Sequence, residues 1–359
     1  MKILFSGGGT LGPVTPLLAI KEVIENNPDF LNTEFVWLGT KTGPEKYFLK
    51  SYNLKFKEII SGKFRRYFSF ANIIDIFKIF TAFFQAFFIL LKEKPDVCIS
   101  AGGFVSVPVH IAAWFLGIPT WIHQQDYKVG LANNIMKVFA SIITTSLEEH
   151  LMFFSKQKTF WLGNPVREEI FLGNKEEAKK IFNLKTNLPI IFVTGGGTGS
   201  LRINQMIIEA LPHLQNQVQI IHLSGENREK NNLKEAEKLF NFYHTYSFFS
   251  FEMKHAFAAA DLIISRGGFG TLTEISALKK TAIIIPKTGH QLDNVKFLAK
   301  EKAVVFLDER FSDGLILAGK IKELLQNESE RIEMSKKLNK KLPVAKKEKI
   351  IEIFKKILK

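Results

Sequence analysis

Short apolar runs rich in β-branched residues alternate with longer amphipathic stretches along the whole chain. In the first half these runs cover residues 2–5, 34–38, 56–60, 95–100, 119–123, 141–145 and 159–162. In the second half they cover residues 189–194, 218–223, 243–249, 261–265, 281–286 and 303–307. Strands that alternate with helices are typical of parallel sheets covered on both faces. The pattern therefore predicts an α/β protein with two doubly wound parallel-sheet domains.

The two halves also repeat one another in detail. ILFSGGGTLG at 3–12 has a counterpart in IIFVTGGGTGS at 190–200, and each is a predicted strand that runs into a glycine turn and a helix. The turn signal Gly163-Asn164-Pro165 marks the boundary between the halves. We expect a first domain at 1–164, a second at 165–339 and a lysine-rich terminal helix at 340–359.

Charge and cysteine content narrow the class of protein. The chain has 49 basic and 35 acidic side chains, a net charge of +14, which favours anionic partners such as phosphates, acidic lipids or nucleic acid. Its single cysteine, Cys98, excludes a disulfide framework or a cysteine metal cluster within one chain and fits a reducing, cytoplasmic setting. We expect neither a signal peptide nor a spanning helix, because the apolar run 79–91 is shorter than the roughly 20 residues a span needs.

The first glycine turn raises the question of a nucleotide cofactor. Gly7, Gly9 and Gly12 fit the spacing G-x-G-x-x-G, which brings backbone N–H groups and a helix N-terminus to one point and suits phosphate. A nicotinamide site would also need an acidic residue at the end of the second strand, where this chain has Leu38-Gly39-Thr40-Lys41. We therefore expect a phosphate ligand other than a nicotinamide cofactor, with a plain βα turn as the alternative.

Two further glycine clusters follow predicted strands. SRGGFGTLTE at 265–274 places its glycines and Thr271 at a helix start, where a diphosphate could dock, with Glu274 in the first turn to accept from sugar hydroxyls. The alternative is that Glu274 only complements the helix dipole. SAGGFVSVP at 100–108 lies at a carboxyl edge of the first sheet, where open α/β sheets bind ligands.

With these segments in order, the sequence resembles the MurG family of bacterial transferases over nearly its whole length. The most specific stretches are SAGGFVSVPVHIAAWFLGIPTWIHQQ at 100–125, GNPVR at 163–167, SRGGFGTLTE at 265–274 and HQLDN at 290–294. The resemblance implies the GT-B architecture, two Rossmann-like domains with an interdomain cleft, and a terminal helix that packs back on the first domain. It also implies transfer of N-acetylglucosamine from UDP-N-acetylglucosamine, held by the second domain, to an undecaprenyl-pyrophosphate-linked muramoyl-pentapeptide, held by the first.

Site residues follow from the same resemblance. The residues expected at the donor are Thr10, Leu11, Gly12, Asp126, Arg167, Gly197, Phe269, Gly270, Thr271, Leu272, Thr273, Glu274, Gln291 and Asn294. Those expected at the acceptor are Gly102, Gly103, Phe104, His123 and Asn133. A surface helix remains the alternative for Gln291 and Asn294. The sequence has no D-x-D carboxylate pair for a metal, so we expect no metal or other cofactor, and helix N-termini with Arg167 would support the diphosphate.

Departures from the family pattern bear on the catalytic base. Leu11-Gly12-Pro13 stands where the family has glycine-glycine-histidine, and His123-Gln124-Gln125-Asp126 stands where it has His-Glu-Gln-Asn; Gly197 replaces a serine. Pro13 cannot take a proton, and the opening turn is therefore expected to be a phosphate and sugar cradle without a base. His123 at a strand end is typical of a structural histidine. We assign the base to Asp126, with a loop-capping aspartate as the alternative.

A basic and aromatic segment suggests a membrane surface. GKFRRYFSF at 62–70 carries Lys63, Arg65 and Arg66 just before the apolar run 73–91, which suits an anionic bilayer, although a core helix with a solvated loop is the alternative. The resemblance favours peripheral attachment at the cytoplasmic face of the cell membrane. Nucleic acid is not expected as a partner, because no recognition motif accompanies the charge.

Two other functions remain open from the sequence. The substituted acceptor loop is compatible with a GT-B transferase that acts on a different lipid. It is also compatible with a non-catalytic sugar-nucleotide-binding or lipid-binding protein that has lost its base.

Overall fold

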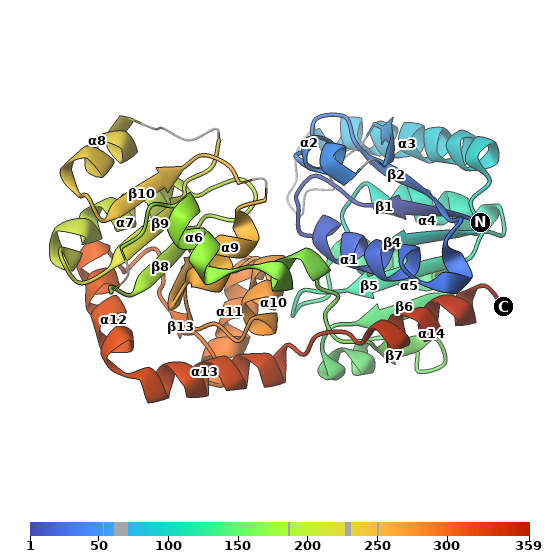
Figure 1. The fold of residues 1–359 in the computed structure, drawn as a ribbon. Helices are drawn as coiled ribbons and strands as arrows, with labels where there is room; N and C mark the ends of the chain where they lie inside the picture. The colour runs from blue at the N-terminus through green and yellow to red at the C-terminus, as the bar shows by residue number, and fades with distance from the viewer. Residues whose placement is uncertain (53, 61–70, 186, 227–230, 250) are drawn as a thin grey trace. The chain divides into compact units, whose positions relative to one another are not determined.

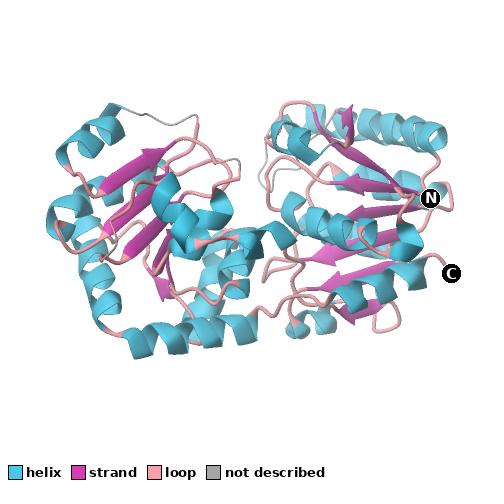
Figure 2. Ribbon diagram, in the orientation of Figure 1, coloured by secondary structure: helices cyan, strands magenta, loops and turns pink. Residues whose placement is uncertain are grey.

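A computed structural model describes residues 1–52, 54–60, 71–185, 187–226, 231–249 and 251–359. The chain forms two compact units, the first from residues 1–167 and 344–359 and the second from residues 168–343. In each unit a parallel sheet lies between layers of helices (Figures 1 and 2). This confirms the predicted α/β class with two doubly wound sheets.

The first unit contains a seven-stranded sheet in the order β3-β2-β1-β4-β5-β6-β7. Its strands are β1 (Lys2–Ser6), β2 (Glu34–Thr40), β3 (Lys55–Ile59), β4 (Val97–Ser100), β5 (Thr120–Gln124), β6 (Ile142–Thr145) and β7 (Thr159–Trp161). Its α-helices are α1 (Val14–Glu25), α2 (Glu45–Phe48), α3 (Ala71–Glu93), α4 (Ser106–Phe115), α5 (Leu131–Phe139) and α14 (Lys347–Ile357). Short 3₁₀ helices are η1 (Pro28–Phe30), η2 (Leu49–Tyr52) and η3 (Glu148–Phe153).

Alternate side chains of the strands build the two faces of this sheet. Ile3 and Phe5 of β1 pack into the core formed with α1 and α14, whereas Leu4 packs into the core formed with α3 and α4. Because both faces are covered, the strands β4, β5 and β6 are buried along their whole length, whereas the edge strand β3 is partly exposed. The terminal helix α14 is amphipathic and buries Phe354, whose ring meets Phe30 edge-on at 4.9 Å.

The second unit contains a six-stranded sheet in the order β10-β9-β8-β11-β12-β13. Its strands are β8 (Ile190–Thr194), β9 (Gln219–Leu223), β10 (Tyr243–Tyr246), β11 (Leu262–Ser265), β12 (Ala282–Ile284) and β13 (Val305–Phe306). Its α-helices are α6 (Lys175–Ile181), α7 (Leu201–Leu214), α8 (Asn231–Leu239), α9 (Met253–Ala259), α10 (Phe269–Ala277), α11 (His290–Lys300), α12 (Gly314–Gln326) and α13 (Glu328–Lys341), with the 3₁₀ helix η4 (Glu168–Leu172) before them. Helices α7 and α12 pack together in its main core with the strand side chains.

The strand order of both sheets reverses next to a glycine turn. Strand β1 has β2 on one side and β4 on the other, and strand β8 has β9 on one side and β11 on the other. Ligands of open α/β sheets bind at such switch points, outside the carboxyl ends of the strands. The four glycine clusters found in the sequence follow β1, β4, β8 and β11, so each sheet has two of them at its switch point. Within the described residues, no helix combines the length and the apolar character that crossing a bilayer requires.

Candidate active site

In the second unit, the turn after β11 ends in a helix N-terminus that no side chain caps. Gly268 is the N-cap of α10, and it has no side chain to accept a hydrogen bond from the first-turn amides. Thr273 instead bonds backward through its hydroxyl to the carbonyl oxygens of Phe269 and Gly270, at 2.7 and 2.8 Å. The amides at the start of α10 therefore form a positive site suited to a phosphate.

Helix α11 packs directly against this turn. A Cβ at Gly267 would lie 2.5 Å from Cγ2 of Val295 and 2.8 Å from the carbonyl oxygen of Gln291. The buried Asn294 donates through Nδ2 to the carbonyl oxygen of Gly267 at 3.3 Å. The structure thus brings Gln291 and Asn294 to the glycine turn, and the surface-helix alternative is wrong for Asn294.

Glu274 lies deeper in α10 than predicted. The helix begins at Phe269, so Glu274 is its sixth residue and falls in the second turn, not the first. Its side chain is largely buried. The favourable charge–dipole interaction of a helix fades beyond the first turn, and this weakens the purely structural interpretation of Glu274.

The neighbouring turn after β8 is the second half of this switch point. Thr194 pairs with Ser265 across β8 and β11, so the turns 195–199 and 266–268 leave adjacent strands at the same edge. Gly196 and Gly199 have φ values of +75° and +68°, which glycine adopts without strain. Gly197 is exposed at the tip of the turn, and Ser200 caps α7 by accepting from the amide of Ile203 at 3.2 Å.

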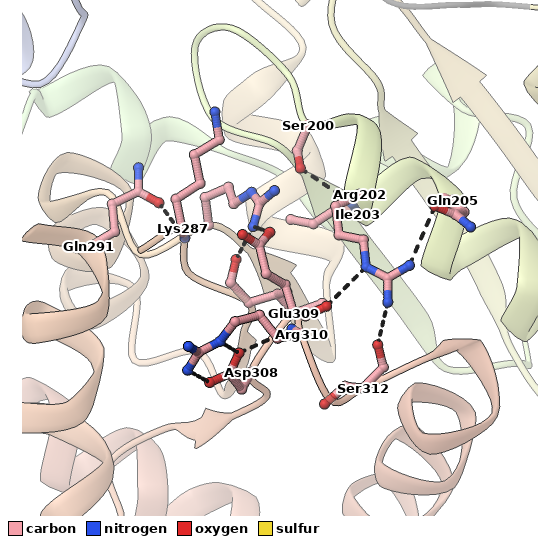
Figure 3. A network of polar contacts seen from close by, with 12 residues as sticks. Ser200, Arg202, Ile203, Gln205, Lys287, Gln291, Asp308, Glu309, Arg310 and Ser312 are labelled. Carbon is pink, nitrogen blue, oxygen red and sulfur yellow. Dashed lines mark hydrogen bonds and ion pairs between the residues drawn. The ribbon is translucent and has the colours of Figure 1, made fainter. Parts of the chain in front are cut away.

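A polar network around Glu309 was not predicted from the sequence (Figure 3). Arg266 donates through one guanidinium nitrogen to the carbonyl oxygen of Ile285 at 2.8 Å and to Oε2 of Glu309 at 2.5 Å. Arg202 donates to the carbonyl oxygens of Glu309 and Ser312, at 3.2 and 2.7 Å. Arg266 follows β11, and these contacts fasten the segment that leads into the glycine turn. The position of Arg266 within the glycine cluster SRGG could have indicated its role from the sequence. No sequence signal indicated Glu309, which lies 43 residues further along the chain.

In the first unit, the turns after β1 and β4 interlock. Gly102 and Gly103 have φ values of +98° and +90°, and a Cβ at Gly103 would lie 3.3 Å from the carbonyl oxygen of Gly8. Ser106 donates to the carbonyl oxygens of Ser6 and Gly102, at 2.9 and 3.0 Å. Hydrogen bonds therefore join the two turns across the switch point.

The predicted acceptor residues lie close together at this edge, where Asn133 also donates to the carbonyl oxygen of His123 at 3.4 Å. A Cβ at Gly102 would lie 3.3 Å from Oδ1 of Asn133, whose Nδ2 donates to Oε1 of Gln124 at 2.7 Å. His123, by contrast, is completely buried; its Nδ1 lies 2.9 Å from Oγ1 of Thr144, and burial lowers the pKa of the ring to about 3. The imidazole of His123 is a neutral core group and presents no surface to a ligand.

The loop after β5 is held from both sides. Gln124 donates through Nε2 to the carbonyl oxygen of Asp126 at 2.6 Å. His150 of η3 lies 2.9 Å, through Nε2, from the carbonyl oxygen of Tyr127, and burial lowers the pKa of His150. The side chain of Asp126 is partly exposed. A partly exposed carboxylate on a braced loop can accept a proton from a bound hydroxyl.

The opening turn differs from the predicted phosphate cradle in one respect. Thr10 and Gly12 are exposed and Pro13 is the N-cap of α1, with φ at −69°, as expected for a turn without a base. The amide of Gly9, however, donates to Oε2 of the buried Glu45 at 3.0 Å. This amide is therefore occupied by a carboxylate of the protein itself.

Arg167 lies mostly inside the first unit. Its NH1 donates to the hydroxyl of Tyr52 at 2.9 Å, and its guanidinium lies over the ring of Phe48 at 5.7 Å. Within the described ranges, no group of three or more His, Cys, Asp or Glu side chains is placed to hold a metal ion. Lys63, Arg65 and Arg66 fall outside the described residues.

Comparison with known proteins places the chain in a family. Residues 3–145 match the glycosyltransferase family 28 N-terminal domain, and residues 190–350 match the glycosyltransferase family 28 C-terminal domain. A Clostridium perfringens protein named UDP-N-acetylglucosamine–N-acetylmuramyl-(pentapeptide) pyrophosphoryl-undecaprenol N-acetylglucosamine transferase is 37% identical over 331 residues, 91% of this chain and 90% of the relative. The Clostridium tetani protein of the same name is 34% identical over 340 residues, 93% of each chain.

Solved structures agree in fold. The crystal structure of Acinetobacter baumannii MurG covers 99% of each chain with a TM-score of 0.72 and 24% identity. A UDP-GlcNAc 2-epimerase from Neisseria meningitidis, bound to UDP-GlcNAc, covers 99% of this chain and 100% of its own with a TM-score of 0.70 and 14% identity. The two domain matches and the curated relatives confirm the predicted resemblance: the chain is a glycosyltransferase of family 28 and belongs to the MurG family.

Proposed function

We propose that the protein transfers N-acetylglucosamine from UDP-N-acetylglucosamine to the undecaprenyl-pyrophosphate-linked muramoyl-pentapeptide, forming a β-1,4 linkage. The observation that carries the proposal is the pair of glycine turns at the switch point of each sheet, with an uncapped N-terminus at α10. The full-length similarity to curated transferases of that name supports the choice of both substrates.

The second unit would hold the donor. The diphosphate would lie against the amides that begin α10, and Glu274 would accept hydrogen bonds from the ribose. This site in the second unit would be completed by Gly197, the segment 269–274, Gln291 and Asn294. In the first unit, the residues proposed as donor contacts rest on the family resemblance alone: Thr10, Leu11, Gly12, Asp126 and Arg167. Fixed dipoles of this kind stabilise the negative charge that develops on departing UDP.

The first unit would hold the acceptor. The acceptor residues would lie at the carboxyl ends of β4 and β5, and they are Gly102, Gly103, Phe104 and Asn133. His123 would support them from the core. Asp126 would take the proton of the attacking hydroxyl while its oxygen forms a bond to the anomeric carbon. The bond from that carbon to UDP breaks, its electrons leave with UDP, and the sugar inverts from α to β.

An apolar helix face supports attachment to the cytoplasmic face of the cell membrane. Phe80, Phe84 and Phe88 of α3 are exposed at a spacing of four residues and so form one stripe along the helix. Trp114 and Phe115 of α4, which packs against α3, are exposed as well. Exposed aromatic side chains on adjacent helices, in a chain with a net charge of +14, suit the interface of an anionic bilayer.

One experiment separates the possible functions. UDP release and sugar transfer would be measured with the lipid-linked muramoyl acceptor and, in parallel, with a glycerolipid acceptor. Transfer to the muramoyl acceptor alone is the expected result. Transfer to the glycerolipid would indicate a different lipid substrate, and binding of UDP-N-acetylglucosamine without any transfer would indicate a non-catalytic protein.

A further inference from the structure

A buried carboxylate lies beneath the opening glycine turn. Glu45, the first residue of α2, has no exposed surface. Its Oε2 accepts from the amide of Gly9 at 3.0 Å, and its Oε1 accepts from the amide of Thr40 at 2.8 Å and from the Thr40 hydroxyl. The side chain therefore joins the turn after β1 to the end of β2.

Three hydrogen-bond donors of the protein bind the Glu45 carboxylate. Burying a carboxylate is costly unless hydrogen bonds replace its water, and here the amides of Gly9 and Thr40 and the Thr40 hydroxyl do so. Glu45 also lies against Gly8 and Gly43, where a Cβ would collide with its carboxylate oxygens. The Glu45 carboxylate therefore fits beside the turn only because Gly8 and Gly43 have no side chains, and its hydrogen bonds in turn hold the turn in place.

We propose that Glu45 is a positioning residue that presets the opening turn and replaces a phosphate as the acceptor for the Gly9 amide. The exposed tip of the turn, Thr10 and Gly12, is then held rigidly as a contact surface for sugar. This inference rests on the proposed function, because it assigns the donor diphosphate to the second unit and leaves the opening turn to orient the reacting sugars.

The free protein offers a direct test of the link between Glu45 and Gly9. In Glu45→Gln the amide has the same size but cannot accept hydrogen bonds at both ends, so at least one of the three donors loses its partner. Hydrogen exchange of the segment 6–12 should become at least tenfold faster than in the wild type. Addition of UDP to the wild type should leave that exchange unchanged, because the Gly9 amide is already bonded.

A second buried carboxylate of the same unit provides the matched control. Glu93 accepts from Lys55 at 2.7 Å and from Lys2 at 3.5 Å at the amino ends of β3 and β1, away from the glycine turns. Glu93→Gln should lower the melting temperature and leave both exchange of 6–12 and kcat within about twofold of the wild type. A general loss of stability would affect both variants alike, whereas loss of positioning would affect only Glu45→Gln.

The kinetic test compares the effect of the substitution on kcat with its effect on the Kd for UDP. Glu45→Gln should lower kcat by about 10- to 100-fold, the range expected when a reacting group is displaced by an ångström, with the Kd for UDP within about twofold. A parallel loss of UDP affinity, or protection of 6–12 by UDP, would overturn the proposal by making the turn a phosphate cradle. Equal kcat for the Glu45 and Glu93 variants would reduce Glu45 to a structural role.

Two further conditions keep the outcome decisive. If Glu45→Gln does not fold, Thr40→Val removes one donor while the carboxylate stays, and the same measurements on it should give a smaller change in the same direction. If the wild type transfers no sugar, the proposed function fails, but exchange of 6–12 and UDP binding still decide the role of Glu45.

Discussion

The ring of Phe104 lies against the backbone of Gly9 and leaves no room for a side chain there. A Cβ at Gly9 would lie 2.6 Å from Cε1 of Phe104, and the φ of Gly9 is +82°. The turn after β1 and the turn after β4 are therefore locked together by a contact that only glycine permits.

Gly9→Ala should destabilise the first unit. The substitution strains the backbone and displaces the Phe104 ring, so we expect the free energy of unfolding to fall by about 1–3 kcal/mol. Urea denaturation measures the change. Gly12→Ala is the matched control: its Cβ would meet only the Thr10 hydroxyl at 3.6 Å, an ordinary contact, and stability should stay unchanged. Equal stability of the wild type and the Gly9 variant would contradict this account.

Glu274→Ala should weaken donor binding. Removal of a charged acceptor from the ribose hydroxyls typically costs about 1.5–3 kcal/mol, so the KM for UDP-N-acetylglucosamine should rise roughly 10- to 150-fold. Steady-state kinetics and calorimetric titration with UDP measure this. Glu323→Ala, on the exposed face of α12, should leave the KM unchanged. An unaltered KM for the Glu274 variant would remove that residue from the donor site.

The sequence predicted the strands and the glycine turns because their signals are local. A strand buried on both faces is a continuous apolar run, and a glycine turn lies next to the strand that it ends. Glu45 and Glu309 escaped prediction because their partners, Gly9 and Arg266, lie 36 and 43 residues away in the chain. His123 was expected among the acceptor contacts, but its place at a strand end is also typical of a structural histidine, and its ring lies in the core.

Asp126→Asn should separate turnover from donor binding. If Asp126 takes the acceptor proton, kcat should fall by about 10²–10⁴-fold, while the Kd for UDP stays nearly the same. Single-turnover transfer assays and titration with UDP provide the two numbers. Asp29→Asn, an exposed carboxylate of the same unit, serves as the control. Full turnover by the Asp126 variant would place the base elsewhere.

The aromatic stripe of α3 should be needed for vesicle binding. Replacement of Phe80, Phe84 and Phe88 with serine removes exposed apolar surface, so the fraction bound to vesicles that contain anionic phospholipid should fall at least fivefold. Sedimentation with the vesicles measures this at low and high salt. As a control, serine at the exposed Phe248, Phe251 and Phe311 of the second unit should leave binding intact. Loss of binding in both variants would count against a specific role for α3.

The buried imidazole of His110 should make the protein sensitive to acid. His110 lies in α4 with no exposed surface and no hydrogen-bond partner for either ring nitrogen among the described residues, and burial lowers its pKa to about 3. An unfolded histidine binds its proton near pH 6.5. Between these values the unfolded state binds more protons, so stability is complete above about pH 6.5 and falls as the pH drops toward 3.

His110→Leu should flatten this dependence. A histidine that is neutral in the folded state and protonated in the unfolded state adds up to about 1.4 kcal/mol per pH unit to the slope of the unfolding free energy against pH. Between pH 6 and pH 4, the slope for His110→Leu should therefore be lower than the wild-type slope by up to this amount. Urea denaturation at several pH values gives the slope. At pH 7.5 the variant should be at least as stable as the wild type, because it no longer buries two polar atoms without partners. His213→Gln, at an exposed position of α7, should keep the wild-type slope. Identical slopes for the wild type and His110→Leu would mean that His110 takes up its proton in the folded protein as readily as in the unfolded chain.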